Sequence, residues 1–104
     1  MSDSDGRVST ADIQREERGP SGGRWTVVLD GHVAEMTYSR SSAALIIIDH
    51  TEVPDALRGR GVGKALVLRA VEDARATGKK ILPLCPFAAA QFRRHPEWSD
   101  ILSR

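Results

Sequence analysis

The sequence predicts one small domain of the α/β (α+β) class, with its elements in the order β-β-β-α-β-α. Three observations lead to this prediction. Two strand patterns are joined by a hairpin turn, an apolar run follows that has no polar face, and a helical period begins after a glycine-rich loop. At 104 residues the chain is long enough for one hydrophobic core and too short for a catalytic and a separate recognition domain.

The first two strands are expected within residues 25–38. Residues 25–29 (WTVVL) are apolar or β-branched, and Asp30-Gly31 is typical of a two-residue hairpin turn. The returning strand, residues 32–38, alternates along its length. Its side chains should therefore face two ways, with Val33, Glu35 and Thr37 opposite to Ala34, Met36 and Tyr38.

The next strand is predicted to be central. Residues 43–48 (AALIII) are apolar on both faces, which favours a strand covered on both sides, and the strand continues to Val53. From Gly61 onward the apolar residues recur at helical spacing, and Gly78 is a suitable C-terminal cap.

The last two elements follow directly. Residues 81–84 (ILPL) predict a short strand, and Cys85-Pro86 opens a second helix because proline suits the first helical position. His95-Pro96 ends this helix. A short apolar segment around Trp98 and Ile101 completes the chain.

The N-terminal residues 1–23 differ in composition from the rest. They are rich in Ser, Asp, Glu, Arg and Gly, with only scattered apolar residues, so we expect a disordered tail there and a folded domain over 24–104. These first residues lack the apolar segment of a secretory signal, and the longest apolar run is too short to span a bilayer. We therefore expect no membrane partner and a cytoplasmic location.

Charge and cysteine content exclude several classes of function. The net charge of +1 gives no general attraction for nucleic acid. The one cysteine, Cys85, can form neither an internal disulfide nor a cysteine-based metal cluster, and we expect no metal. A monomer or a weak dimer is the expected state.

The segment RGRGVGK, residues 58–64, is the strongest motif. It lies between a strand and a helix, where glycines let backbone N–H groups converge on an anion at the helix N-terminus. It is not a Walker A motif, because Ala65 follows Lys64, and the dinucleotide fingerprint fails because Lys64 occupies the last glycine position. The alternative is a tight connection with solvated basic residues around it.

The remaining pattern, R-x-x-G-x-G at Arg58, Gly61 and Gly63, resembles the acetyl-coenzyme A loop of the GNAT acetyltransferases. The segments HTEVP (50–54), LCPF (84–87) and RHPE (94–97) extend this resemblance to a subfamily of small acetyltransferases with a cysteine at this place. It covers residue 24 to the C-terminus. The resemblance implies a mixed sheet without the helices that this family usually has between its first two strands.

The resemblance also implies a cofactor and an acceptor. The cofactor would be acetyl-coenzyme A, and the acceptor an amine whose identity the sequence does not give. The backbone N–H and C=O of Val53 would bind the thioester and the pantetheine arm. The implied cofactor-binding residues are Val53, Arg58, Gly59, Arg60, Gly61, Val62, Gly63 and Lys64.

Cys85 is a candidate catalytic residue. It follows a strand and precedes a helix, and a helix N-terminus favours the thiolate. The alternative is an inert buried residue. The resemblance implies that the end of this strand faces the thioester, so Cys85 is predicted to be acetylated transiently or to exchange a proton beside the coenzyme A sulfur.

His50 and Glu52 are candidate bases. They are alternate residues of one strand and share a face, and either could accept the proton of an incoming ammonium. The alternatives are a surface histidine, and an ion pair of Glu52 with Arg58 or Arg60. Many acetyltransferases of this superfamily use a tyrosine of the last helix as acid, and residues 87–94 contain none.

The expected function is transfer of an acetyl group to an amine, either directly or through S-acetyl-Cys85. The competing hypothesis is a coenzyme A-binding or adaptor module with weak catalysis. A short chain has little material for substrate recognition, which supports this second hypothesis.

Overall fold

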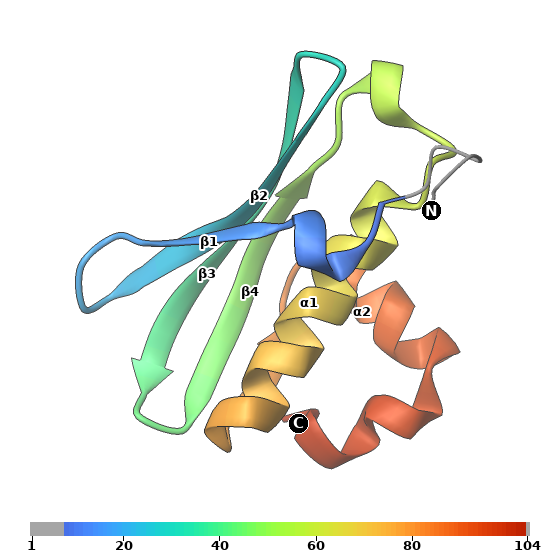
Figure 1. Ribbon diagram of the computed structural model, residues 1–104. Coiled ribbons are helices and arrows are strands. Elements are labelled where there is room, and N and C mark those ends of the chain that lie inside the picture. The colour runs from blue at the N-terminus through green and yellow to red at the C-terminus, as the bar shows by residue number, and fades with distance from the viewer. Residues whose placement is uncertain (1–7, 104) are drawn as a thin grey trace.

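The computed structural model describes residues 8–103 and shows a five-stranded sheet with two α-helices on one side of it (Figure 1). Residues 1–7 of the predicted tail, and residue 104 of the predicted domain, lie outside the described residues. In chain order the elements are η1 (Thr10–Asp12), β1 (Gln14–Glu17), β2 (Gly22–Leu29), β3 (His32–Ser42), β4 (Leu45–Glu52), η2 (Asp55–Leu57), α1 (Val62–Thr77), β5 (Lys80–Pro83), α2 (Pro86–Arg94) and η3 (Pro96–Ile101).

The sheet is mixed. Its strand order is β1-β2-β3-β4-β5, with antiparallel pairing from β1 to β4 and parallel pairing between β4 and β5. From β2 to α2 the order is the predicted β-β-β-α-β-α, so the predicted fold class is confirmed. Gly78 caps α1 with φ 69°, as predicted. No helix within residues 8–103 is long and apolar enough to cross a membrane.

The prediction of a disordered tail is wrong for residues 8–23. β1 pairs with β2 along its whole length, and Ile13, just before it, is buried in the core. The guanidinium of Arg15 lies over the rings of Trp25 and Tyr38, and the Tyr38 hydroxyl donates a hydrogen bond to Glu17 at 2.7 Å. An edge strand held by charged and aromatic contacts needs few apolar residues of its own, so composition does not reveal it.

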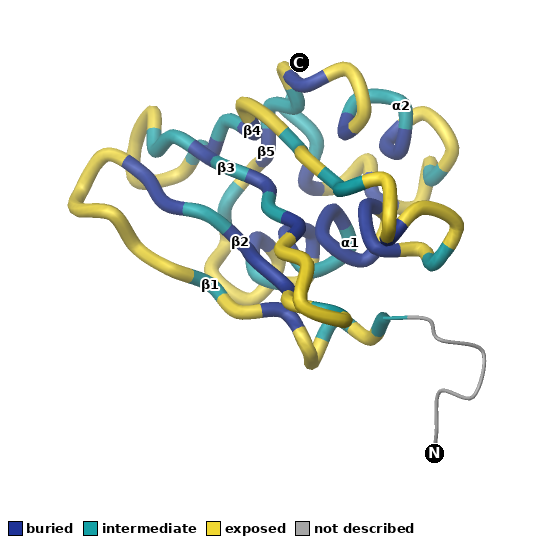
Figure 2. Tube along the Cα trace, turned by 90° about the horizontal axis from the view of Figure 1, so that it is seen from above, coloured by how far each residue is buried: buried dark blue, intermediate teal, exposed yellow. Residues whose placement is uncertain are grey.

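The core lies between the sheet and α1. The inner face of the sheet contributes Trp25, Met36, Ile46, Ile48 and Ile81, all fully buried, and Figure 2 shows buried residues gathered where the sheet faces the helices. Complete burial of one such side chain stabilises the fold by about 1.5–3 kcal/mol.

The opposite face of the sheet is less covered than predicted. Leu45 and Ile47 in β4 are only half-buried, while Val28 and Val33 at the β2–β3 hairpin are 63% and 49% exposed. The prediction of a central strand covered on both faces is therefore wrong for this face. The reason is that α1 and α2 lie on the same side of the sheet (Figure 2).

Candidate functional site

The parallel strands β4 and β5 part at one point. Their pairing ends with Ile48 opposite Pro83. The Ile48 carbonyl then accepts hydrogen bonds from the N–H groups of both Leu84 and Cys85, each at 3.1 Å. Beyond this point β4 continues to Glu52 while the other chain segment turns into α2. Among the described residues, no strand lies beside this edge of β4 between the two diverging segments.

A β-bulge decides which side chains of β4 face the helices. Tyr38 lies opposite Ile48 but Thr37 lies opposite His50, so Asp49 is an extra residue in β4. The Ser39 hydroxyl donates a hydrogen bond to the Asp49 carboxylate at 2.7 Å and holds the bulge. One extra residue reverses the alternation of the strand that follows it.

The bulge places Thr51 toward the helices, and His50 and Glu52 away from them. Thr51 pairs with the buried Met36 and shares its face. His50 and Glu52 share one face, as predicted, but it is the open face of the sheet. Their side chains are 62% and 68% exposed, with 3.8 Å between His50 Nε2 and Glu52 Oε1.

The loop before α1 presents free backbone donors. Gly59 and Gly61 have φ values of 79° and 73°, which only glycine adopts without strain. The first turn of α1 closes with a bond from Ala65 N–H to the Gly61 carbonyl. Within residues 8–103, no group accepts a hydrogen bond from the N–H of Gly59, Gly61, Val62, Gly63 or Lys64.

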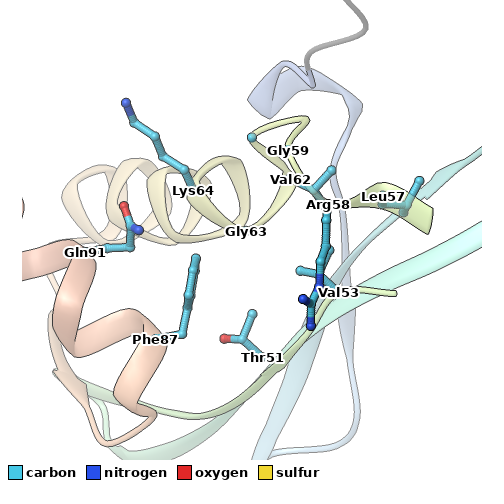
Figure 3. A pocket seen from close by; sticks show the side chains of 11 residues that line it. Thr51, Val53, Leu57, Arg58, Gly59, Val62, Gly63, Lys64, Phe87 and Gln91 are labelled. Atoms are coloured by element: carbon cyan, nitrogen blue, oxygen red, sulfur yellow. The ribbon is translucent and has the colours of Figure 1, made fainter. Parts of the chain in front are cut away.

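Gly63 allows α2 to approach α1 closely. A Cβ atom at this position would lie 2.5 Å from Cζ of Phe87, so no larger residue fits without moving that ring. Phe87 itself is partly exposed and lies below Gly63, toward Thr51 (Figure 3).

These features enclose a cleft of about 490 Å³ between β4, the loop and α2 (Figure 3). Of the predicted cofactor-binding residues, it brings together seven: Val53, Arg58, Gly59, Gly61, Val62, Gly63 and Lys64. Four more lining residues were not predicted: Thr51, Leu57, Phe87 and Gln91.

Arg60 is the one loop residue that does not line this cleft. Its guanidinium forms an ion pair with Asp30 of the β2–β3 hairpin at 2.6 Å. Arg58 pairs with Asp55 at 3.0 Å, and its side chain is 77% exposed, so its charge remains in contact with solvent. The ion pair of Glu52 with Arg58 or Arg60, considered above, is not among the described contacts, where Glu52 lies beside His50.

Gln91 is the most informative residue that sequence reasoning missed. It lies one helical turn after Phe87 on the same face of α2 and is only 7% exposed. No buried side-chain nitrogen or oxygen within residues 8–103 lacks a hydrogen-bond partner, and no partner is described for the Gln91 carboxamide, so its polar atoms are open to the cleft. An amide that can be reached from a cleft offers a donor and an acceptor to a ligand.

Cys85 lies at the N-cap of α2, with Pro86 at the first helical position as predicted. It is 5% exposed, and its thiol donates a hydrogen bond to the Thr51 hydroxyl at 3.4 Å. Cys85 does not line the cleft. It lies behind Thr51, at the point where the strands diverge.

The arrangement fits an extended ligand with a diphosphate in its middle part. Free N–H groups and the positive end of α1 suit the phosphates. The part of the cleft that is lined by Val53, Phe87 and Thr51 suits an amide-containing arm, for which Gln91 offers a donor and an acceptor. Residues 8–103 hold no cluster of three or more metal-ligating side chains.

Comparison with known proteins agrees with this geometry. The family model of the GCN5-related N-acetyltransferases matches residues 24–101. A solution NMR structure of a GCN5-like N-acetyltransferase candidate from Staphylococcus aureus is 31% identical, covers 89% of this chain and 90% of its own, and superposes with a TM-score of 0.65. No curated protein matches the chain. On the family match, the chain belongs to the GCN5-related N-acetyltransferase family.

Proposed function

We propose that this protein binds acetyl-coenzyme A in the cleft and transfers the acetyl group to an amine. One observation carries the proposal: the free N–H groups of the loop line a cleft that also reaches Thr51, the β4 residue that accepts a hydrogen bond from Cys85 at the point where β4 and β5 part. A diphosphate at the loop would direct the rest of the cofactor toward that gap. The thioester would then lie beside Thr51.

The loop and the edge of β4 would bind different parts of the cofactor. The amides of Gly59 and Gly61 to Lys64 hold the diphosphate, and the side chains of Arg58 and Lys64 add positive charge. Val53 lies beyond the last paired residue of β4, and no described residue hydrogen-bonds to its backbone. Its N–H and C=O are available to the pantetheine arm, as the Gln91 carboxamide is.

When bound, the cofactor would supply the acetyl group as a thioester: the C–N bond to the acceptor would form, the C–S bond would break, and coenzyme A would leave as its thiol. An ammonium acceptor loses two protons in this reaction, of which one ends on the coenzyme A sulfur and the other needs a base. His50 and Glu52 lie on the open face of the sheet, where Nε2 or the carboxylate can take it from an amine that approaches from this side. Glu35 lies opposite Glu52 but is paired with Arg24 at 2.6 Å, so of these two carboxylates Glu52 is the one available to a cation.

Direct attack by the amine is the better supported route. Cys85 is 5% exposed and its thiol donates a hydrogen bond to the Thr51 hydroxyl, so its sulfur is poorly placed to attack a carbonyl carbon in the cleft. We assign Cys85 the role of orienting the Thr51 hydroxyl. Mass measurement after incubation with acetyl-coenzyme A tests this, because stable or transient acetylation that disappears in Cys85→Ala would establish the two-step route instead.

A coenzyme A-binding module with weak catalysis is the second candidate. The observation that favours it is the chemistry of the cleft lining. Of the 11 lining residues only Arg58 and Lys64 are ionisable, and the lining contains no tyrosine, cysteine, histidine or carboxylic acid to serve as the acid for the leaving sulfur.

Calorimetry with acetyl-coenzyme A, followed by a thiol-release assay over amines, lysine peptides and polyamines, distinguishes the candidates. If the protein transfers acetyl groups, acetyl-coenzyme A should bind, and the coenzyme A thiol should be released in the presence of at least one amine. The rate of thiol release should fall in Glu52→Gln or His50→Asn. Binding without release supports the module. Binding of neither coenzyme A nor its acetyl form contradicts both. A cytoplasmic location and the oligomeric state stay predictions.

A further inference from the structure

A second cavity, of about 560 Å³, lies between β5, α2 and η3, in the C-terminal part of the fold (Figure 1). Ala89, Phe92 and Arg93 line it from α2, on the opposite face of this helix from Phe87 and Gln91, which line the first cleft. The described linings of the two hollows share no residue. A ligand in the second cavity would therefore bind apart from the cofactor.

The walls of this cavity suit a ligand with an apolar body. Small-molecule sites are typically cavities of about 300–1,000 Å³ with mostly apolar walls and a few polar groups. Six of the ten lining residues are apolar, and Phe92 among them is only 5% exposed. The six are Leu82, Pro83, Ala89, Phe92, Pro96 and Leu102.

The charged groups that line the cavity are basic. Arg93 and His95 are its ionisable residues, and within residues 8–103 no carboxylate lines it. Seven of the ten arginines in this range form an ion pair with an acid, whereas Arg93 has no such partner there. Because a guanidinium is always charged in a protein, Arg93 offers the cavity a positive charge that an anion can pair with.

His95 is held by its neighbours in the segment RHPE (94–97), which the first cleft does not use. Its Nδ1 lies 2.9 Å from the Glu97 carboxylate, and its ring stacks on Trp98 with 4.1 Å between centroids. A carboxylate beside Nδ1 keeps a proton on that nitrogen, so Nε2 is the ring nitrogen left for other contacts.

A peptide strand is a less suitable occupant than a small molecule. β5 lies at the edge of the sheet, but Pro83 has no N–H to donate. The Ile81 carbonyl already accepts a hydrogen bond from Ser103 N–H at 2.8 Å, and Leu102 forms a parallel bridge with Ile81. An added strand would find few backbone partners at this edge.

We propose that this second cavity binds a small carboxylate with an aliphatic chain. The apolar walls would take the chain, and the Arg93 guanidinium would pair with the carboxylate, with His95 beside it. The inference goes beyond the proposed function and does not depend on it, because the cavity and the cofactor cleft have separate linings.

The test titrates octanoate into the full-length chain, labelled at its leucine and alanine methyl groups, and follows the NMR resonances. The methyl resonances of Leu82, Ala89 and Leu102 should shift saturably, and those of the exposed Leu84, which does not line the cavity, should not. Octylamine has the same chain and the opposite charge, and should bind about fivefold more weakly. Octanoate should bind about threefold more tightly than heptanoate, which has one CH₂ group less.

Two neighbouring arginines provide matched variants. Arg93→Gln removes the charge from the cavity and should weaken octanoate binding about fivefold. Arg94→Gln, outside the lining, should stay within about twofold of wild type. Both positions are exposed, so both variants should fold, which thermal unfolding checks.

Several outcomes would overturn the inference. These are the absence of saturable shifts with octanoate, equal binding of octylamine, equal affinities of the two arginine variants, or displacement of octanoate by coenzyme A. Shifts of the same methyl groups on raising the protein concentration alone would assign the cavity to a second copy of the chain. Tighter binding of N-acetyl-leucyl-leucine than of octanoate would assign it to a peptide carboxylate.

Discussion

Replacement of Gly59 by alanine isolates the role of the loop conformation. Gly59 has φ 79°, and an added Cβ would meet no described heavy atom within 4 Å, so the cost is conformational and not steric. An alanine in this region destabilises the fold by about 1 kcal/mol. If the loop relaxes to relieve this strain, its N–H groups turn, and the loss of one hydrogen bond to a charged phosphate costs about 1.5–3 kcal/mol. Coenzyme A affinity should then fall roughly ten- to hundredfold.

Gly78 provides the matched control at the other end of α1. Its φ is 69°, and an added Cβ there also meets open space. Gly78→Ala should therefore lower the melting temperature about as much as Gly59→Ala, by roughly 4 °C, but leave coenzyme A affinity unchanged. Calorimetric titration and thermal unfolding measure the two quantities. Wild-type affinity in Gly59→Ala, or equal losses in the two folded variants, would refute the argument.

Three further predictions follow from the site and its surroundings. Gln91→Leu should keep the stability of the fold but weaken coenzyme A binding about tenfold, and unchanged affinity would remove the carboxamide from the site. Gly63→Ala should displace the Phe87 ring and lower affinity with little loss of stability, since that ring is partly exposed and able to move. Hydrogen bonds from Tyr38 and Arg40 lower the pKa of Glu17 below 4.5, so its contribution to stability is present above that pH and is lost as the pH falls below it. The free energy of unfolding, measured with urea, should fall less on acidification in Glu17→Gln than in wild type. An identical fall in the two proteins would contradict this.

The sequence allowed the loop and the helix ends to be predicted because their signals are local. Positive φ values at Gly61 and Gly78 require a residue without Cβ, and the pair Cys85-Pro86 carries its own helix-start signal. The hairpin turn at Asp30-Gly31 is of the same kind. Such positions need no knowledge of what lies across the sheet.

The features that escaped prediction depend on contacts between distant residues. The bulge at Asp49 arises from pairing with β3 and from the Ser39 hydroxyl, so nothing near Asp49 in the sequence reports it. It is this bulge that directs Thr51, and not His50, toward the helices. β1 was not predicted for a similar reason, because its stability comes from the contact of Arg15 with the rings of Trp25 in β2 and Tyr38 in β3.

The burial of Gln91 could not be predicted from the sequence either. A glutamine in a helix usually faces solvent, and only the close packing of Gly63 against Phe87 brings this face of α2 against α1. A sequence signal existed in part, because Phe87 and Gln91 are four residues apart and share a helix face. The partner surface that covers this face follows only from the fold.

Titration of isotopically labelled protein with coenzyme A, followed by amide chemical shifts in two-dimensional NMR, tests the phosphate-binding role of the loop most directly. We expect the N–H resonances of Gly59, Gly61, Val62 and Gly63 to shift furthest, with smaller changes at Thr51 and Val53. Saturable shifts that leave these four amides unmoved and gather elsewhere on the molecule would contradict it.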